Sequence, residues 1–206
     1  MKVIENKLNK ELLNIIEPFS TWFFEQDRSL IALDGETDQD EYHTSPEYLK
    51  QMQSEEQVTG FPERVFGADL TRPEVTPISW RPMIRELDNN LNAFFGSRFG
   101  AVKMYYPVGG FMGWHHNANC PGYNILLSFT KTGKGFFRYQ DPITKEIMTI
   151  GDQNGGWTAK VGYYGSWEEK DKIYWHSARA YEERLTLGYV IPNEDFWNMM
   201  VDDLTD

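Results

Sequence analysis

Three histidines and one asparagine in the second half of the chain could hold a metal ion. His115 and His116 follow a glycine-rich turn, and His176 lies sixty-one residues after the first of them. Neutral imidazoles bind iron, zinc, copper or nickel, and only the complete ligand set discriminates among these metals. In an extended strand His115 and Asn117 lie on one face, and His116 points the opposite way. The spacing therefore predicts a metal site made by His115, Asn117 and His176, with coordination positions left open.

Arg184 is a second residue that points to a ligand. It opens the last strongly apolar strand, eight residues after His176. A buried arginine needs an anionic partner, and its planar fork matches a carboxylate with two hydrogen bonds. No acidic residue in the core strands is an obvious partner, although Glu182 and Glu183 are close in sequence. A small carboxylate ligand and a structural ion pair are both open for this arginine.

Short strands must position these side chains. After Ala101 the predicted strands are residues 102–106, 123–129, 134–139, 146–150, 156–163, 172–176 and 184–191. Seven or eight short strands at regular spacing, with no helices between them, favour a mainly β sandwich or barrel. One of these strands is expected to end at His176, whose apolar and aromatic neighbours predict that its ring enters the interior.

The first hundred residues are expected to support this β core. Apolar residues recur at helical spacing at Leu8, Leu12, Ile15, Ile16 and Phe19. Pro18 predicts the end of that helix, and a second helix is expected from Trp80 to Gly96. Residues 34–56 are polar and acidic and predict a solvated loop that carries His43. Residues 58–79 contain prolines and glycines with little periodicity and predict a long irregular loop that could face a substrate.

The chain therefore divides into three parts within a single domain. Residues 1–100 form a helical and loop support region, residues 101–193 the β core, and residues 194–206 an acidic tail that suits a short docking helix. A length of 206 residues is enough to bury a sizeable core. The single cysteine, Cys120, excludes an internal disulfide, and no apolar run is long enough for a membrane helix. We expect a soluble, cytoplasmic protein.

The net charge of −11 is unevenly distributed along the chain. Residues 101–193 hold ten Lys or Arg and eight Asp or Glu, a balance of +2, so the remainder carries −13. Binding to a phosphate backbone needs a basic footprint, which makes nucleic acid an unexpected partner. A protein partner could instead bind the acidic periphery or the tail.

The candidate residues fall into an ordered motif. It runs Tyr106-x-x-Gly109-Gly110-x-x-x-x-His115-x-Asn117, then His176, then Arg184-x-Thr186. This pattern resembles the Fe(II)- and 2-oxoglutarate-dependent oxygenases, especially their prolyl-hydroxylase-like branch. There a tyrosine, a glycine turn, His-x-Asp, a distal histidine and Arg-x-Ser/Thr follow in the same order. The resemblance covers residues 101–193.

The resemblance implies a double-stranded β-helix, or jelly roll, with Fe(II) at its mouth and helices behind the larger sheet. It implies that His115 and His176 bind the iron. Arg184, helped by Thr186, would hold the distal carboxylate of 2-oxoglutarate, whose keto acid end chelates the metal. O2, the cosubstrate, would take the remaining position, and Tyr106 would line the pocket.

Asn117 stands where the family has Asp or Glu. An amide carbonyl is neutral and a weaker donor than a carboxylate, so iron would bind less tightly. Asn117 could still bind the metal through its oxygen, or another acid, a halide or a water could fill the position. Alternatively, the metal site has been lost. A register shift of one residue would bring His116 or Asn119 to this position instead.

The predicted function is therefore that of a dioxygenase, a hydroxylase acting on a protein side chain or a small molecule. The alternative is a weak or silent jelly-roll protein with a binding or virion-assembly role, because Asn117 replaces the ligand carboxylate. A cupin-like hydrolase or isomerase is a third interpretation. An enzyme needs an open pocket between Arg184 and the histidines, whereas a structural protein would dock a partner through exposed aromatic residues such as Phe196 and Trp197.

The local sequence around the site also resembles that of phage-encoded members of this superfamily. Gly-Trp-His-His-Asn is followed by Gly-Phe-Phe-Arg-Tyr-x-Asp-Pro. Such an origin would place the protein in the host cytoplasm. It would also make a role in a virus particle a competitor to catalysis.

Overall fold

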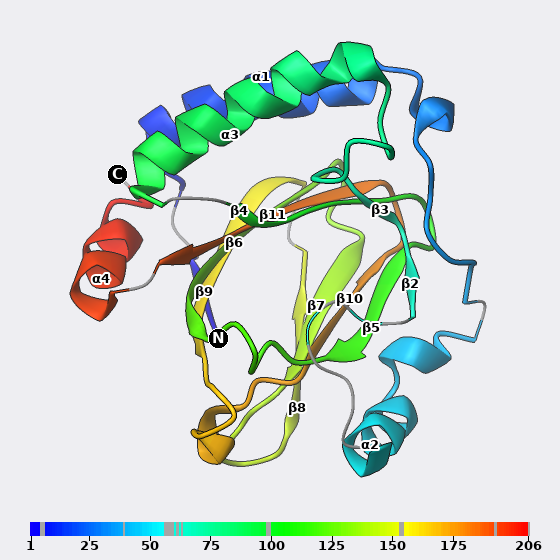
Figure 1. Ribbon diagram of the computed structural model, residues 1–206, viewed down its shortest axis with the longest axis vertical. Helices are drawn as coiled ribbons and strands as arrows, with labels where there is room; N and C mark the ends of the chain where they lie inside the picture. Colours follow the sequence, from blue (N-terminus) through cyan, green and yellow to red (C-terminus); the bar gives the residue numbers. More distant parts are fainter. Residues whose placement is uncertain are drawn as a thin grey trace.

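The structure is a computed structural model in which two antiparallel sheets lie face to face (Figure 1). It describes residues 1–4, 7–38, 40–55, 60, 62, 64–97, 100–152, 155–191 and 193–205. The larger sheet has the order β1 (Lys2–Ile4), β9 (Gly156–Tyr164), β6 (Gly122–Thr130), β11 (Arg184–Ile191), β4 (Gly100–Tyr106) and β3 (Ala68–Asp69). The smaller has the order β2 (Val65–Phe66), β5 (Phe111–His115), β10 (His176–Ala180), β7 (Gly135–Gln140) and β8 (Ile147–Gly151).

The order of the strands is that of a double-stranded β-helix. From β4 to β11 the chain passes between the two sheets at every step except the β7–β8 hairpin, and all pairings are antiparallel. Neighbouring strands in each sheet are therefore far apart in sequence, as in other jelly rolls. The predicted fold class, mainly β with supporting helices, is confirmed. Strands β1, β2 and β3, from the first hundred residues, extend the edges of the two sheets.

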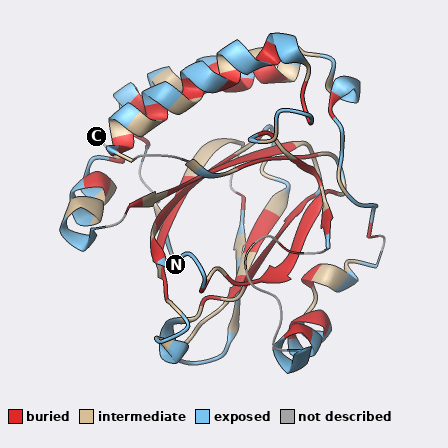
Figure 2. Ribbon diagram, viewed as in Figure 1, coloured by how far each residue is buried: buried red, intermediate tan, exposed pale blue. Residues whose placement is uncertain are grey.

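Helices cover the outer faces of both sheets. They are α1 (Lys10–Glu25), α2 (Pro46–Glu55), α3 (Arg81–Phe95) and α4 (Glu194–Asp202), with short 3-10 turns η1 (Arg28–Leu30), η2 (Tyr42–Thr44), η3 (Ile78–Trp80) and η4 (Lys170–Lys172). Helices α1 and α3 lie side by side over the larger sheet, and their buried sides face it (Figure 2). The main apolar core lies between these helices and that sheet. Nowhere in the described chain is a helix long and apolar enough to cross a lipid bilayer.

Helix α1 corrects the prediction that Pro18 ends the first helix. The helix continues through Pro18 to Glu25. An interior proline removes one backbone hydrogen bond and costs a helix about 3 kcal/mol. Continuation buries Phe19 and Phe23 in the main core, where both rings also contact Trp22. Tertiary packing thus outweighs the local signal.

Three further predictions about local structure were wrong or incomplete. The polar 34–56 segment contains helix α2, whose apolar side packs against Trp114 of the smaller sheet. The 58–79 segment contains the short strands β2 and β3, although residues 56–59, 61 and 63 lie outside the described part of the chain. The strand expected to end at His176 instead begins there. Each of these elements packs on or pairs with a distant part of the chain. A local sequence pattern carries no information about such contacts.

Two other predictions are confirmed. Helix α3 ends at Gly96, whose φ of 58° is the left-handed conformation that glycine tolerates. The tail forms α4, which packs on the chain's own core. Trp197 donates a hydrogen bond of 3.3 Å to the Asn124 carbonyl, and Phe196 lies against Gly96. Phe196 and Trp197 are half-buried in these contacts and are not the fully exposed aromatic residues that the sequence analysis expected.

Candidate functional site

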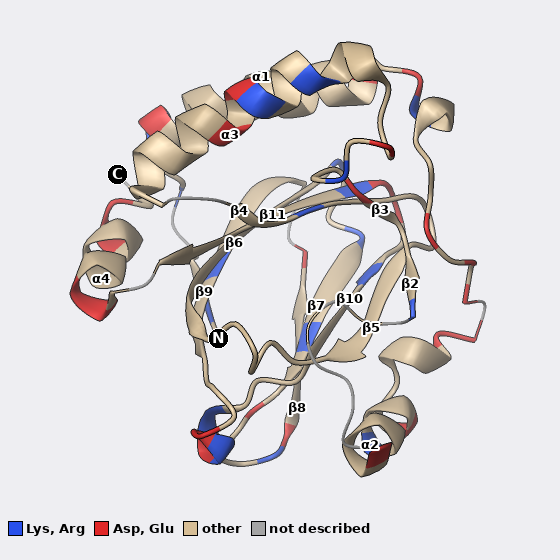
Figure 3. Ribbon diagram, in the orientation of Figure 1, with Lys and Arg blue, Asp and Glu red and all other residues tan. Residues whose placement is uncertain are grey.

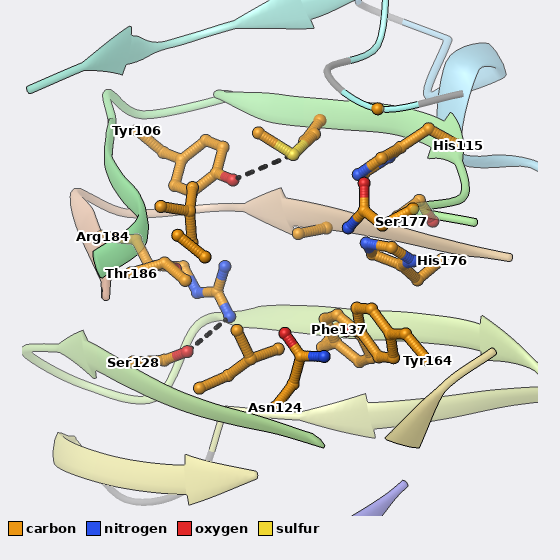
Figure 4. A pocket seen from close by; sticks show the side chains of 17 residues that line it. Tyr106, His115, Asn124, Ser128, Phe137, Tyr164, His176, Ser177, Arg184 and Thr186 are labelled. Carbon is orange, nitrogen blue, oxygen red and sulfur yellow. Dashed lines mark hydrogen bonds between the residues drawn. The ribbon is translucent and has the colours of Figure 1, made fainter. Parts of the chain in front are cut away.

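A cavity of about 190 Å³ lies between the two sheets. All six residues singled out in the sequence line it, namely Tyr106, His115, Asn117, His176, Arg184 and Thr186. The two histidine rings lie side by side at one end of the cavity, and Arg184 lies at the other (Figure 4). The cavity therefore has two imidazole rings at one end and a cationic group at the other.

A β-bulge in β5 places His115 in the cavity. His176 of β10 pairs with His115, but Ala178 pairs with Met112, so β5 contains one extra residue between the two pairs. Strict alternation would put Met112 and His115 on opposite faces, whereas the bulge lets both line the cavity. Gly113 suits the bulge, because a Cβ there would lie 2.9 Å from a neighbouring backbone oxygen.

Both histidines are held in the form that binds a metal. Their ring centroids are 4.1 Å apart. Nδ1 of His115 lies 2.9 Å from the Gly113 carbonyl, and Nδ1 of His176 lies 2.9 Å from the Tyr174 carbonyl. A carbonyl can only accept, so each Nδ1 carries the proton and each Nε2 keeps its lone pair. Burial lowers the pKa of His115 to about 4 and that of His176 well below its ordinary value, so both rings are neutral near pH 7.

Asn117 is the third group at this end of the cavity. It follows β5 and lines the same space as His115, as the alternation argument predicted. Neither alternative lines this cavity: His116 lies between the rings of Trp167 and Trp175, 4.7 Å from each, and Asn119 is exposed outside the cavity. Within the described residues, no group of three His, Cys, Asp or Glu side chains could hold a metal. A metal here would have two imidazoles and an amide as side-chain ligands.

Arg184 already has an acidic partner, so the structural ion pair, one of the two alternatives left open in the sequence, is present. Asp152 immediately follows β8, and its Oδ2 lies 2.8 Å from the arginine Nε. Nη2 of Arg184 donates hydrogen bonds to Asp152 Oδ1 at 3.2 Å and to Ser128 Oγ at 3.1 Å. The ammonium of Lys160 lies 3.3 Å from the same Oδ1. All three charged side chains are at most 2% exposed.

Several polar atoms that line the cavity have no partner among the described residues. Nη1 of Arg184 makes no hydrogen bond to any described residue. The hydroxyls of Thr186, Ser177 and Tyr164 are buried and also lack partners in the described chain. Tyr106 has only a 3.8 Å contact to a methionine sulfur, a weak acceptor. Buried polar groups are normally satisfied, so these groups are available to ordered water or to a polar molecule between the sheets.

Three cavity residues on β6 and one residue behind Arg184 were missed in the sequence. Asn124, Leu126 and Ser128 alternate along β6 and share the face that lines the cavity, and Asp152 supports Arg184 from behind. The polar residues at positions 124 and 128 of an otherwise apolar strand were a usable signal for an inward polar face. Asp152 had no such signal, because it lies thirty-two residues from its partner in a loop.

Comparisons with known proteins add little to this geometry. No family model and no curated protein matches the sequence. Among solved structures, the chain is similar to the crystal structure of a Pseudomonas putida prolyl-4-hydroxylase. The match has 14% identity and a TM-score of 0.35, and it covers 85% of this chain and 98% of that one. A likeness this loose says nothing about activity, cofactor or substrate. The resemblance to phage proteins stays a prediction.

Proposed function

We propose that the cavity binds Fe(II) and 2-oxoglutarate and that the protein is a dioxygenase that hydroxylates a C–H bond. One observation carries this proposal: two neutral imidazoles and a guanidinium lie at opposite ends of one small cavity between the sheets. Imidazoles with an oxygen ligand and open positions suit non-haem iron. The guanidinium suits a carboxylate. A keto diacid presents a chelating group and a carboxylate at its two ends.

The residues at the metal end fit this ion in part. His115, His176 and the Asn117 amide oxygen would hold the Fe(II). The carbonyls of Gly113 and Tyr174 fix both rings with Nε2 free, which is the usual arrangement around metal-bound histidines. When bound, Fe(II) and 2-oxoglutarate together supply the activation of O2 for oxidation of a C–H bond.

The residues at the other end fit a carboxylate. The hydroxyl of Thr186 is buried without a partner among the described residues, and the hydrogen bonds of Arg184 come from Nη2 and not from Nη1. This hydroxyl and Nη1 would hold the distal carboxylate of 2-oxoglutarate. Asp152 and Ser128 occupy the other edge of the guanidinium and fix its plane. The site therefore offers the carboxylate one guanidinium nitrogen and one hydroxyl group. A bidentate pair with the guanidinium is not available, because its other edge is taken by Asp152 and Ser128.

Aromatic and aliphatic side chains form the walls between the two ends. Phe137 stacks on His176 at 5.7 Å, and Tyr164 lies 4.9 Å from the same ring. Leu126 and Ala178 line the remaining wall. A dry wall strengthens the attraction between the guanidinium and a carboxylate, because the local dielectric constant is low. The prime substrate would be a small molecule or a protein side chain that reaches the histidine end.

Asn117 favours a second candidate function. Two histidines without a third His, Cys, Asp or Glu among the described residues make a weak metal site. The protein would then be a jelly-roll binding module that keeps the anion site at Arg184 but catalyses no oxidation. The two candidates differ in whether Fe(II) is taken up.

Anaerobic titration with Fe(II) and 2-oxoglutarate separates these candidates. A dioxygenase is expected to develop a visible charge-transfer band that needs both components. His176→Ala should abolish the band and all Fe(II)-dependent turnover of 2-oxoglutarate. His43→Ala is the matched control, because that ring stacks on Phe111 outside the cavity. No band and no metal uptake by the unaltered protein would favour the binding module.

A further inference from the structure

Arg184, Lys160 and Asp152 form a charged cluster that has one more positive charge than negative. Arg184 and Lys160 share the single carboxylate of Asp152. The pKa of Asp152 is opposed by burial but is held below its ordinary value by the two cations, so the carboxylate is ionised. Burial lowers the pKa of Lys160 to about 8, which leaves the ammonium protonated near pH 7. The cluster therefore carries +1 at neutral pH.

Among the described residues, Asp152 is the only carboxylate within ion-pair distance of Lys160 or Arg184. Of the described residues, the only charged groups that act on the pKa of Asp152 or Lys160 are each other and Arg184. The side chains of Lys160 and Arg184 are each 1% exposed, so solvent does not neutralise them. Burial of an uncompensated charge is costly, and buried charges are normally paired. An anion that arrives beside Arg184 would make the cluster neutral.

Only one member of the cluster can reach that anion. Arg184 lines the cavity, while Lys160 and Asp152 lie behind it. Nζ of Lys160 contacts Asp152 Oδ1, the same oxygen that Nη2 of Arg184 contacts. Without Lys160, the Asp152 carboxylate would neutralise the guanidinium completely and leave no charge for a ligand. Lys160 thus acts through Asp152.

We propose that Lys160 and Asp152 are positioning residues that set the charge accepted beside Arg184 to one negative charge. This inference rests on the proposed function, because it concerns the ligand end that docks at Arg184. It adds a specificity: a monoanionic carboxylate is preferred over a dianionic phosphate, which would leave the cluster with a buried negative charge. It also assigns roles to two residues that do not touch the ligand.

Four proteins test the charge rule. The cluster carries +1 in the unaltered protein, 0 in Lys160→Met, +2 in Asp152→Asn and +1 again in the double variant. Titration calorimetry with 2-oxoglutarate in the presence of Mn(II) should show a loss of about tenfold to a hundredfold in Lys160→Met, as expected for removal of a nearby buried charge. The double variant should recover most of this loss. Inorganic phosphate should bind best to Asp152→Asn.

Titration with Mn(II) alone controls for the integrity of the fold, since all four proteins keep the histidine end. If Lys160→Met does not fold, the double variant should still bind 2-oxoglutarate more weakly than Asp152→Asn does. Recovery in the double variant distinguishes a charge effect from lost packing. A double variant that binds as poorly as Lys160→Met, or a Lys160→Met that binds as well as the unaltered protein, would overturn the charge rule.

The same titrations separate this inference from the proposed function. If 2-oxoglutarate binds the unaltered protein and Lys160→Met equally, the charge rule is wrong and the proposed function stands. If none of the four binds 2-oxoglutarate but affinities for acetate rank with cluster charge, the proposed function fails and the charge rule holds. Absence of any anion binding would refute both.

Discussion

Two buried arginines five residues apart in sequence have opposite surroundings. Arg184, on β11, faces the cavity between the sheets and shares one carboxylate, Asp152, with a lysine. Arg179, on β10, lies on the outer face of the smaller sheet. Its guanidinium lies 3.7 Å from Asp38 and 3.5 Å from Glu41, and it also donates to the Asp38 carbonyl. These acids come from the segment between α1 and α2, where Asp and Glu are frequent (Figure 3).

The difference lies in how the positive charge is balanced. Two carboxylates surround Arg179, so its charge is used to hold the acidic segment on the smaller sheet. At Arg184 two cations share one carboxylate, so a positive charge is left for a ligand. Burial alone therefore does not identify a ligand-binding arginine: both side chains are at most 5% exposed. The balance of charge within contact distance does.

Replacing each arginine with methionine should separate the two roles most strongly. Arg184→Met should weaken binding of 2-oxoglutarate at least a hundredfold, about 2.7 kcal/mol, while Asp152 and Lys160 remain paired and preserve stability. Arg179→Met should leave binding intact and lower the melting temperature, because Asp38 and Glu41 lose their buried partner. Calorimetric titration and thermal unfolding measure both effects. Equal losses of binding in the two variants would contradict the division of roles.

Gly135 lies between Asp152, the partner of Arg184, and the backbone of Arg179. Its substitution should give the next largest effect, a loss of stability. A Cβ at this position would lie 2.6 Å from Asp152 Oδ2 and 2.8 Å from the Arg179 carbonyl oxygen. Gly135→Ala should therefore destabilise the protein by about 1–3 kcal/mol, as overpacking does. Gly151→Ala is the control, because its Cβ would meet nothing closer than 4.0 Å. Chemical denaturation measures the difference, and equal stabilities would show that residue 135 does not constrain Asp152.

The outer face of the smaller sheet has carboxylates around its arginine, whereas the histidine end of the cavity has none among the described residues. Adding a carboxylate at that end tests whether this difference limits metal binding. Asn117→Asp should strengthen Fe(II) binding by roughly tenfold, because it supplies the charged oxygen ligand that the site lacks. Asn119→Asp makes the same change in charge at an exposed position outside the cavity and should have little effect. Anaerobic metal titration compares the two. Similar gains in both variants would indicate a general charge effect and not a ligand.

The smallest expected effect is the dependence of stability on pH that Lys160 contributes. The pKa of Lys160 is lowered to about 8 from its ordinary value of 10.5. Between these values the unfolded chain keeps the proton and the folded chain releases it, so stability rises with pH. Relative to Lys160→Met, the unaltered protein should gain on the order of 1 kcal/mol between pH 7.5 and 9.5, roughly the window of this shift.

Denaturation at both pH values measures this gain. Tyrosines contribute equally to the pH dependence of stability in both proteins, so their contribution cancels in the comparison with Lys160→Met. Arg179→Met, which keeps Lys160, should retain the gain. A difference that stayed constant with pH would show that Lys160 is not buried in its charged form.

The sequence alone determined several of the strands and part of the candidate site. The apolar strand 184–191, the helix that ends at Gly96 and the separation of His115 from His116 all follow from local periodicity and turn chemistry. His115, Asn117, His176 and Arg184 were identified because metal and carboxylate binding restrict the residue types. These properties depend on neighbours within a few positions, which the sequence states directly.

The tertiary structure alone decided how those residues are paired. Asp152 meets Arg184 across thirty-two residues, and an extra residue in β5 brings Met112 and His115 to one face. Packing carries α1 through Pro18. In a jelly roll, neighbouring strands are distant in sequence, so register and ion pairing depend on long-range contacts that no local pattern contains. The surplus charge at Arg184 follows from those contacts, because one loop residue neutralises one of two cations.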